Sequence, residues 1–306
     1  MVAACNLRGV RAVTAGRGRE PSVTTTSAPA WSASDSLLVV TGWQQHGDGV
    51  FSRRYRSLHL NIGVVVCGDG LLVIDTRATH AEAAELQRDI RRLSPLPVQW
   101  VVNTHHHWDH TFGNHEFLPA PIWGHEGCRR MLVEHGEEMR DAVIRWAPGH
   151  AALFEEVVIT PPDHTFRDAA TVAFGGRTVE FRHLGRGHTD NDIVVTVPGT
   201  GVLFAGDLVE QGAPPAFQDS FPLEWPDTAA ELLGSCDGPV VPGHGRVVDR
   251  AFVAAQQAEI AEVARLARER NLDGMTPADA AQAGGPYPPE TLLPAFQRAW
   301  RHLAEQ

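Results

Sequence analysis

The stretch VVNTHHHWDHTFGN, residues 101–114, carries four histidines and one aspartate at the end of a short apolar run. That run predicts a buried strand, which places the histidines in the loop where the strand ends. His105 and His107 are two residues apart, so in an extended segment they point to the same side and can bind one ion. Asp109 and His110 follow where the chain turns and can face a second ion. Imidazole and carboxylate are the usual nitrogen and oxygen ligands of zinc, so the stretch predicts a metal site.

Two side chains of this stretch are expected to stay outside the ligand set. His106 and Trp108 alternate with the candidate ligands and should point away from the ions, into packing. A polar loop whose histidines cluster by chance is the competing interpretation. Five potential ligands within residues 105–110 disfavour it.

Three further ligand candidates come from separate parts of the chain. His188 follows a predicted strand that ends at Leu184, Asp207 follows the predicted strand of residues 202–205, and His244 follows a short strand in VVPGHG. A strand-end His or Asp alone often only caps a loop, but beside the histidine stretch these three complete a two-metal site. Glycine allows the tight turns that bring backbone close to an ion. The flanking glycines are Gly185, Gly187, Gly206, Gly243 and Gly245.

Length, composition and charge narrow the class of protein. The 306 residues suffice for one large domain or two ordinary ones, and 43% of them are hydrophobic. A net charge of −11 would repel phosphate backbones, so nucleic acid is not an expected partner. No apolar run approaches the roughly 20 residues of a membrane span, and residues 1–23 lack the apolar segment of a secretory signal. We therefore expect a cytoplasmic protein with a small-molecule substrate and no membrane partner; the oligomeric state stays open.

The predicted elements interleave strands and helices. Hairpins are expected at residues 68–70, 175–176 and 198–201, and helices over 78–93, 126–139, 225–236, 249–270 and from about 289. Hairpins favour mixed sheets, so the expected fold class is α/β (α+β), with two facing sheets and helices on the outer faces. Residues 36–42 should form a first strand, and residues 1–33 should be disordered. Residues 34–306 are expected to form a single domain, with C-terminal helices from about 249.

At this point the chain resembles a known family. The motifs HHHWDH, GHT, AGD and PGHG match the order and spacing of the metallo-β-lactamase fold, over about residues 36–270. The resemblance implies a four-layer αβ/βα sandwich with a two-metal site at one sheet edge. It implies a first metal held by His105, His107 and His188, a second held by Asp109, His110 and His244, and Asp207 bridging both. Asp75, in LLVIDT, matches an aspartate that supports a ligand in the family; the alternative is an N-cap of the next helix.

One position departs from the namesake enzymes. Metallo-β-lactamases resemble one another in having Cys or Ser where this chain has Asp207. A bridging aspartate is typical of glyoxalase-II-like hydrolases, but the C-terminal segment lacks the basic cluster of a glutathione-thioester site. GRGHTDND and FPLEWPDTAAEL look more like the hydrolases named after quinoprotein relay systems.

These observations predict a dinuclear zinc hydrolase of an ester, lactone, thioester or amide. Two zinc ions about 3.5–4 Å apart can share one hydroxide, which attacks the carbonyl carbon. Asp109 is the expected catalytic residue, since it can orient that hydroxide and carry a proton to the leaving group. Substrate choice is expected to come from a mobile lid, residues 44–57, and from a cleft-lining loop, residues 210–225.

Four other functions are weighed against this one. β-Lactamase activity stays open, although Asp207 lowers its rank. A mononuclear-iron enzyme like the persulfide dioxygenases would not need the complete second ligand set. A non-catalytic metal-binding or scaffold protein would be expected to have lost ligands, and a nuclease conflicts with the charge of −11. Metal analysis separates the zinc hydrolases from the iron enzyme.

Overall fold

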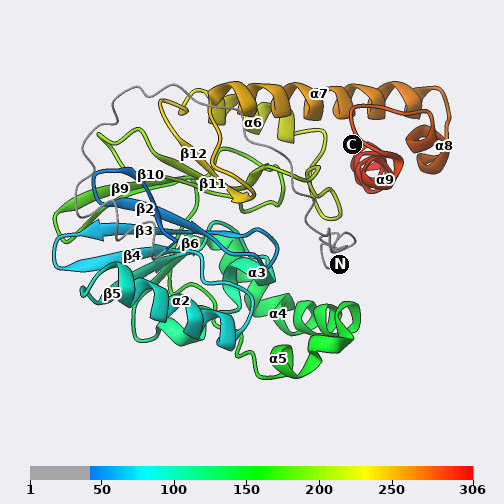
Figure 1. The fold of residues 1–306 in the computed structure, drawn as a ribbon. Coiled ribbons are helices and arrows are strands. Elements are labelled where there is room, and N and C mark those ends of the chain that lie inside the picture. Colours follow the sequence, from blue (N-terminus) through cyan, green and yellow to red (C-terminus); the bar gives the residue numbers. More distant parts are fainter. Residues whose placement is uncertain (1–41, 306) are drawn as a thin grey trace, which may run out of the picture.

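The computed structural model describes residues 42–305, which form two mixed β-sheets with helices outside them (Figure 1). In the first sheet the strand order is β1 (Gln44–Gly47), β2 (Val50–Arg54), β3 (Asn61–Cys67), β4 (Gly70–Ile74), β5 (Val98–Val102), β6 (Ile122–His125) and β7 (His164–Phe166). In the second sheet the order is β12 (Val240–His244), β11 (Leu203–Glu210), β10 (Val194–Thr196), β9 (Arg177–Arg182) and β8 (Ala169–Phe174). Both sheets mix antiparallel hairpins with parallel pairs, as the sequence predicts.

Helices occupy both outer faces. The α-helices are α2 (His80–Leu93), α3 (Trp108–Thr111), α4 (Glu126–Trp146), α5 (Ala151–Glu155), α6 (Trp225–Leu233), α7 (Arg250–Leu272), α8 (Pro277–Gln282) and α9 (Pro289–Ala304). Two short 3₁₀ helices are η1 (Asn114–Phe117) and η2 (Pro148–His150). In Figure 1, α2 and α4 lie below the first sheet and α6 and α7 above the second. The predicted four-layer sandwich is therefore confirmed.

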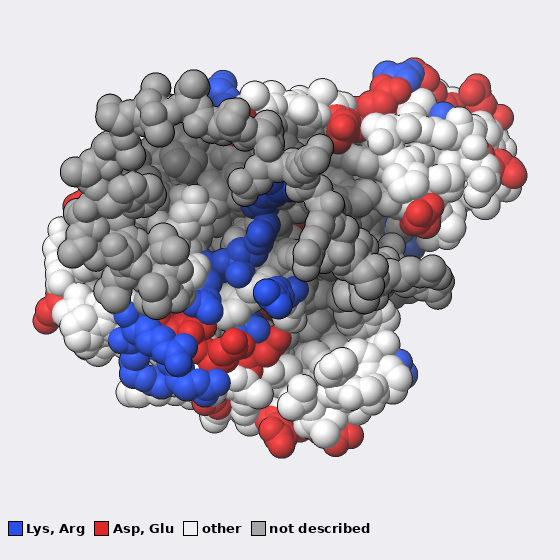
Figure 2. Space-filling model, in the orientation of Figure 1, with Lys and Arg blue, Asp and Glu red and all other residues white. Residues whose placement is uncertain are grey.

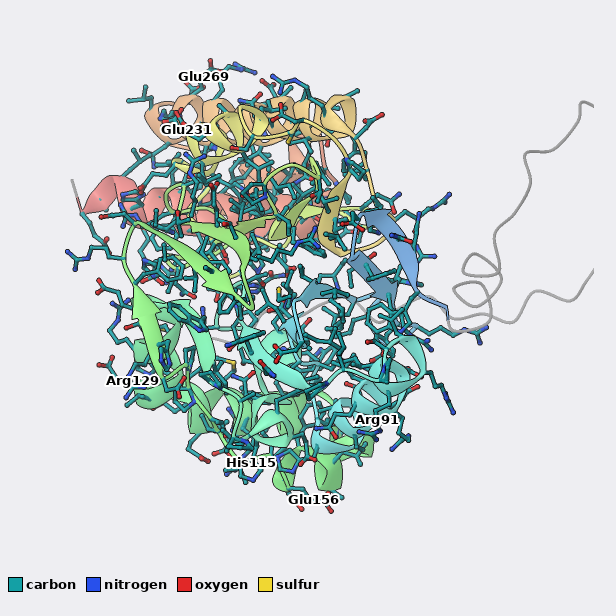
Figure 3. All side chains as sticks on the ribbon, turned by 90° about the vertical axis from the view of Figure 1, so that its left-hand side faces the viewer. Arg91, His115, Arg129, Glu156, Glu231 and Glu269 are labelled. Carbon is teal, nitrogen blue, oxygen red and sulfur yellow. The ribbon has the colours of Figure 1, made fainter. Side chains whose placement is uncertain are left out.

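The central strands are buried on both faces, which explains their nearly continuous apolar sequences. In β3, Val65 faces the second sheet and packs in one cluster with Phe181 and Phe204. Val64 faces the other way and packs in a second cluster with Leu86 of α2. Figure 3 shows side chains filling the space between the layers, with polar residues such as Glu231 and Glu269 outside.

The ends of α2 follow its sequence. Thr79 is the N-cap, and its hydroxyl accepts a hydrogen bond from the Glu82 amide. The helix ends at Leu93, and Pro95 shortly after it cannot continue the helix. Since Thr79 is the cap, the N-cap interpretation of Asp75 is wrong.

Several predicted elements need correction. Most of the expected lid is the β1–β2 hairpin, whose strand β2 pairs with β3 in the first sheet. Its alternating pattern was too short to recognise without the pairing partner. Helix α4 continues to Trp146, seven residues past its predicted end, and α5 follows it where the sequence indicated only an irregular segment. The predicted strand at 36–42 and the predicted disorder of residues 1–33 lie, apart from residue 42, outside the described residues. Within residues 42–305 no helix combines the length and apolar character needed to cross a membrane.

Candidate metal centre

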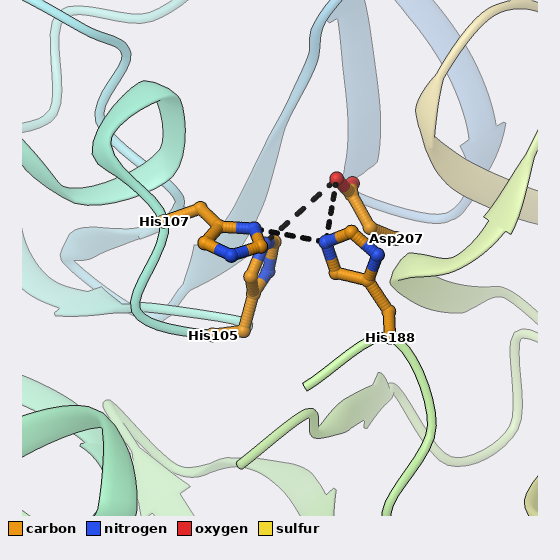
Figure 4. Close-up of side chains that lie close together, drawn as sticks. All are labelled: His105, His107, His188 and Asp207. Carbon is orange, nitrogen blue, oxygen red and sulfur yellow. Dashed lines mark hydrogen bonds and ion pairs between the residues drawn. The ribbon is translucent and has the colours of Figure 1, made fainter. Parts of the chain in front are cut away.

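Four of the predicted ligands converge in one buried group, which we call the first cluster: His105, His107, His188 and Asp207 (Figure 4). His107 Nδ1 lies 3.0 Å from His105 Nε2 and 2.8 Å from His188 Nε2. Asp207 Oδ2 lies 3.5 Å from His188 Nε2 and 3.8 Å from His105 Nε2. Ligand atoms about 2.0–2.1 Å from one tetrahedral ion would be roughly 3.3 Å apart, so this spacing suits a zinc ion.

The other predicted ligands form the second cluster: Asp109, His110 and His244. His244 Nε2 lies 3.4 Å from His110 Nε2 and 3.3 Å from Asp109 Oδ2. Asp207 joins the two clusters, because its Oδ1 is 3.3 Å from His110 Nε2 and its Oδ2 is 3.3 Å from His244 Nε2. The structure thus brings all seven candidate ligands together, although their binding of metal stays a prediction.

In the second cluster, fixed acceptors hold the ring nitrogens that face away from the centre. His110 Nδ1 lies 2.9 Å from Asp75 Oδ2, and His244 Nδ1 lies 2.9 Å from the Leu58 carbonyl oxygen. Both partners accept, so each Nδ1 carries a proton, and each Nε2 can present a lone pair to the centre once it loses its own proton. Asp75 therefore supports a candidate ligand, as the resemblance implied.

In the first cluster, two of the three histidines, His105 and His107, also donate from the ring nitrogen that faces away from the centre. The Thr104 hydroxyl donates to Asp75 Oδ2 at 2.8 Å, so it accepts from His105 Nδ1, 3.1 Å away. His107 is inverted: its Nε2 donates to Asp219 Oδ2 at 2.8 Å, which leaves Nδ1 facing the cluster. Two deprotonated ring nitrogens, His105 Nε2 and His107 Nδ1, would repel each other at 3.0 Å unless a positive charge lies between them. Burial would lower the pKa of His107, but Asp219 raises it, so a proton supplies this charge in the metal-free chain. A metal ion can take its place, so the donor set fits a metal ion.

Positive-φ backbone places two of these acceptors. Asp75 has φ +64° and Leu58 has φ +57°, both in the left-handed region that non-glycine residues rarely adopt. Such conformations cost about 1–3 kcal/mol each and persist where the surrounding structure fixes them. Here they turn the Asp75 carboxylate and the Leu58 carbonyl toward His110 and His244.

Buried charges set the electrostatics of the second cluster. Burial alone would lower the pKa of His110 and of His244, but the neighbouring carboxylates Asp207 and Asp109 raise both well above the usual value. Burial would raise the pKa of Asp207, but His244 and His110 hold it well below its usual range. The centre therefore keeps two ionised carboxylates, which attract cations.

Two of the three first-cluster histidines, His105 and His188, resist protonation. Burial is the main cause that lowers the pKa of His105 well below its usual value, and it lowers the pKa of His188 to about 4. His188 Nδ1 has no hydrogen-bond partner; Glu210 Oε1 lies 3.9 Å from it, and burial and Asp207 raise the pKa of Glu210 to about 8. Neutral imidazoles are the form that binds metal.

The two residues expected to point away do so. His106 Nδ1 accepts a hydrogen bond from the Asn191 amide at 2.9 Å, away from the cluster, and burial lowers its pKa to about 3. Trp108 packs its ring against Phe154 and Trp146. The alternation predicted from the extended segment is confirmed.

Asp207 lies inside a strand, which corrects the sequence prediction. Strand β11 continues through it to Glu210 instead of ending at residue 205, and the pairing with β12 is irregular at Gly206. Gly206 has φ +52°, which turns the following carboxylate into the site. Gly243 on β12 leaves room for it, because a Cβ there would lie 1.8 Å from Asp207 Oδ1.

A cavity of about 560 Å³ adjoins the first cluster. His107 and Asp219 form one side of it, and Trp108, Met131 and Met139 supply apolar surface. The expected loop 210–225 contributes Asp219, while none of residues 44–57 lines this cavity. Helix α4 forms another wall of the cavity, and no pattern in the sequence predicts this role.

Comparisons with known proteins agree with the fold and the motifs. The sequence model of the metallo-beta-lactamase superfamily matches residues 58–266, so the chain belongs to this superfamily. A metallo-beta-lactamase type 2 from Bacteroides fragilis is 31% identical over 188 residues, which are 59% of this chain and 70% of that protein. A linear primary-alkylsulfatase from Pseudomonas sp. is 23% identical over 238 residues, which are 66% of this chain but only 43% of the alkylsulfatase.

Solved structures support the same fold. A metallo-beta-lactamase from Pontibacter korlensis superposes with a TM-score of 0.57 at 22% identity, covering 72% of this chain and 98% of that one. A sec-alkylsulfatase from Pseudomonas sp. superposes with a TM-score of 0.70 at 17% identity, covering 86% of this chain and 50% of that one. At these identities the likeness concerns the fold alone.

Proposed function

We propose that the chain is a dinuclear zinc hydrolase of a small carbonyl substrate: an ester, lactone, thioester or amide. The observation that carries this proposal is the convergence of seven buried side chains in two clusters that share Asp207. Membership of a superfamily whose relatives include a β-lactamase and an alkylsulfatase supports the hydrolase class.

The side chains divide the work. Zinc ions at the two clusters would supply Lewis acidity toward the carbonyl oxygen and lower the pKa of a bound water. Asp109 is buried. Burial alone would raise its pKa, but His110 and His244 have the larger effect, so the pKa of Asp109 is lowered. As an ionised carboxylate beside His244 Nε2, Asp109 can accept a proton from the water and pass it to the leaving group.

The cavity beside the first cluster suits the non-reacting part of a substrate. Its volume of about 560 Å³ lies in the range of small-ligand sites. Trp108 and Met139 are buried side chains that offer it apolar contact. On the face in Figure 2, basic side chains gather in a band from the centre to the lower left, beside acidic ones, while the arms formed by α4–α5 and by α8–α9 are mostly uncharged with scattered charges.

β-Lactamase activity is the second candidate, favoured by the 31% identity to the Bacteroides fragilis enzyme. Asp207 ranks it lower, because that position resembles the bridging-aspartate hydrolases. Sulfate esters are also worth testing as substrates, because one relative is an alkylsulfatase. The small-molecule partner and the cytoplasmic location remain predictions.

The test joins metal content with turnover. Purified chain analysed by elemental mass spectrometry should contain close to two zinc ions and should hydrolyse at least one member of a panel of esters, lactones, thioesters, β-lactams and alkyl sulfates. His107→Ala should abolish that activity, whereas His106→Ala should leave metal content largely intact. A single stoichiometric iron without zinc would overturn the proposal in favour of an oxygen-using enzyme.

A further inference from the structure

The C-terminal helix α9 reaches the metal centre through one arginine. Arg298 donates from Nε to the Ser220 carbonyl oxygen at 2.9 Å and from Nη2 to the Asp219 carbonyl oxygen at 3.0 Å. Asp219 Oδ2 in turn accepts the hydrogen bond from His107 Nε2 at 2.8 Å. Three hydrogen bonds therefore connect α9, through Asp219 and Ser220, to His107, whose Nδ1 faces His105 and His188.

The helix end of this connection is rigid. Leu292, Phe296 and Ala299 are fully buried in the core cluster that also contains residues of α7. The Trp300 indole donates to the Ala267 carbonyl oxygen of α7 at 2.7 Å. Arg298 thus projects from an element that cannot shift without disturbing the core.

The loop end needs such support. Asp219 and Ser220 lie between β11 and α6, in a segment without regular secondary structure. The Phe221 amide donates to the Gly187 carbonyl oxygen at 2.8 Å, and the Phe221 ring lies against the Arg298 guanidinium at 5.3 Å. The contacts of Phe221 fix the backbone on one side of this segment. The hydrogen bonds from Arg298 to the Asp219 and Ser220 carbonyl oxygens fix Asp219 itself, whose carboxylate contacts His107.

We propose that Arg298 is a positioning residue for the first cluster: by fixing the backbone of Asp219, it holds His107 in the orientation and tautomer that present Nδ1 to a metal ion. This inference rests on the proposed metal site. Helix α9 lies outside the residues 58–266 that match the superfamily, so that match assigns it no role. Groups that orient a ligand histidine typically change metal affinity about 10–100-fold when removed.

The test compares Arg298→Ala with Arg301→Ala. Arg301 lies three residues along the same helix, borders the same surface pocket and makes no hydrogen bond to the loop, so it controls for lost charge and helix propensity. Zinc affinity is measured by competition with a chromophoric chelator, and the cobalt-substituted protein gives a visible absorption spectrum that reports coordination. Arg298→Ala should weaken the zinc of the first cluster at least about tenfold and alter the cobalt spectrum. Arg301→Ala should match the wild type.

Two further variants keep the test decisive. Arg298→Lys retains the charge but can reach fewer carbonyls, so its zinc affinity should be intermediate, and it serves if the alanine variant does not fold. Adding Arg298→Ala to Asp219→Asn should weaken zinc no further, because both changes act on His107 through one path.

The outcomes separate this inference from the proposed function. A wild-type chain that binds neither zinc nor cobalt refutes the metal site itself. Suppose instead that the wild type binds both zinc and cobalt, while Arg298→Ala only lowers the melting temperature and leaves the zinc affinity and the cobalt spectrum unchanged. In that case Arg298 is merely structural and the inference is wrong.

Discussion

The proposed two-metal arrangement depends on Asp207 more than on any other single residue. Its two oxygens face different histidines, with Oδ1 toward His110 and Oδ2 toward His244 and His188. A carboxylate at this point also offsets the repulsion between two cations.

Asp207→Asn keeps the shape but removes the charge, and its amide nitrogen cannot ligate. We expect the fold to persist, the second metal to weaken more than the first, and turnover to fall at least about tenfold. Asp207→Cys should retain metal better, because thiolate is a good zinc ligand. Zinc titration of the asparagine variant decides: two tightly held ions would remove Asp207 from the site.

Gly243 matters because of space rather than chemistry. A methyl group there would lie 1.8 Å from Asp207 Oδ1, so Gly243→Ala should displace the carboxylate and lower zinc content and turnover at least about tenfold. Gly149→Ala is the matched control, since no atom lies within 4 Å of its Cβ position. Equal zinc content in both variants would contradict the close approach.

Protonation should empty the clusters in order. In the metal-free chain, Asp207 and Asp109 overcome the effect of burial and raise the pKa of His110 and His244 well above 6.5, whereas the pKa of His188 is about 4. Asp219 also raises the pKa of His107 against the effect of burial, but less than the pKa values of His110 and His244 are raised. Protons therefore compete with metal in the second cluster at a higher pH than in the first. Zinc retained after dialysis at stepwise lower pH should fall first from two ions to one, with the loss beginning as pH drops toward 6. Simultaneous loss of both ions would contradict this order.

At the scale of elements, α4 starts from an unusual cap. His125 Nδ1 accepts a hydrogen bond from the Gly127 amide at 3.0 Å, which requires a neutral ring. Burial, and then the nearby His183, lower the pKa of His125. A protonated ring could neither accept this bond nor sit comfortably at the positive end of the helix dipole.

This cap predicts a pH-dependent stability. The unfolded chain protonates His125 near pH 6.5, the folded chain only at lower pH, so stability is fully present above 6.5 and declines as pH falls through the folded pKa. His125→Asn keeps a good cap without a titrating group. Between pH 7.5 and 5.5 the melting temperature of the wild type should fall more than that of His125→Asn. Parallel decreases would show that His125 does not contribute.

At the scale of the molecule, the centre spans both sheets. His105, His107, Asp109 and His110 follow β5 of the first sheet, while Asp207 and His244 belong to β11 and β12 of the second. Each cluster takes side chains from both halves of the sandwich. A bound ion would therefore tie the two halves together.

Removal of metal should consequently destabilise the whole fold. A ligand present at 1,000 times its Kd stabilises the native state by about 4 kcal/mol, so treatment with a chelator should lower the melting temperature in a single transition. Zinc, but not magnesium, should restore it on re-addition, since the site offers imidazole nitrogens. An unchanged melting temperature after complete zinc removal would contradict the link between the halves.

The sequence by itself was enough to recognise the candidate ligands and to predict most helices and strands. Ligand chemistry resides in side-chain identity, and the alternation of His105, His106 and His107 follows from local backbone geometry, so both can be recognised within a few residues. Hairpins at glycine turns and the amphipathic α2 are local in the same sense. The four-layer sandwich was predicted from the family resemblance of these motifs.

Only the tertiary structure decided what holds the ligands in place. Asp219 and His107 are 112 residues apart, and Leu58 and His244 are 186 apart. Leu58 contributes a backbone carbonyl, which every residue has, so no sequence signal could single it out. For Asp75 the sequence left two roles open, support of a ligand and a helix N-cap, and the contact with His110, 35 residues away, decides between them. Local rules act over a few residues, whereas these acceptors are selected by which chain segments the two packed sheets bring within hydrogen-bond distance.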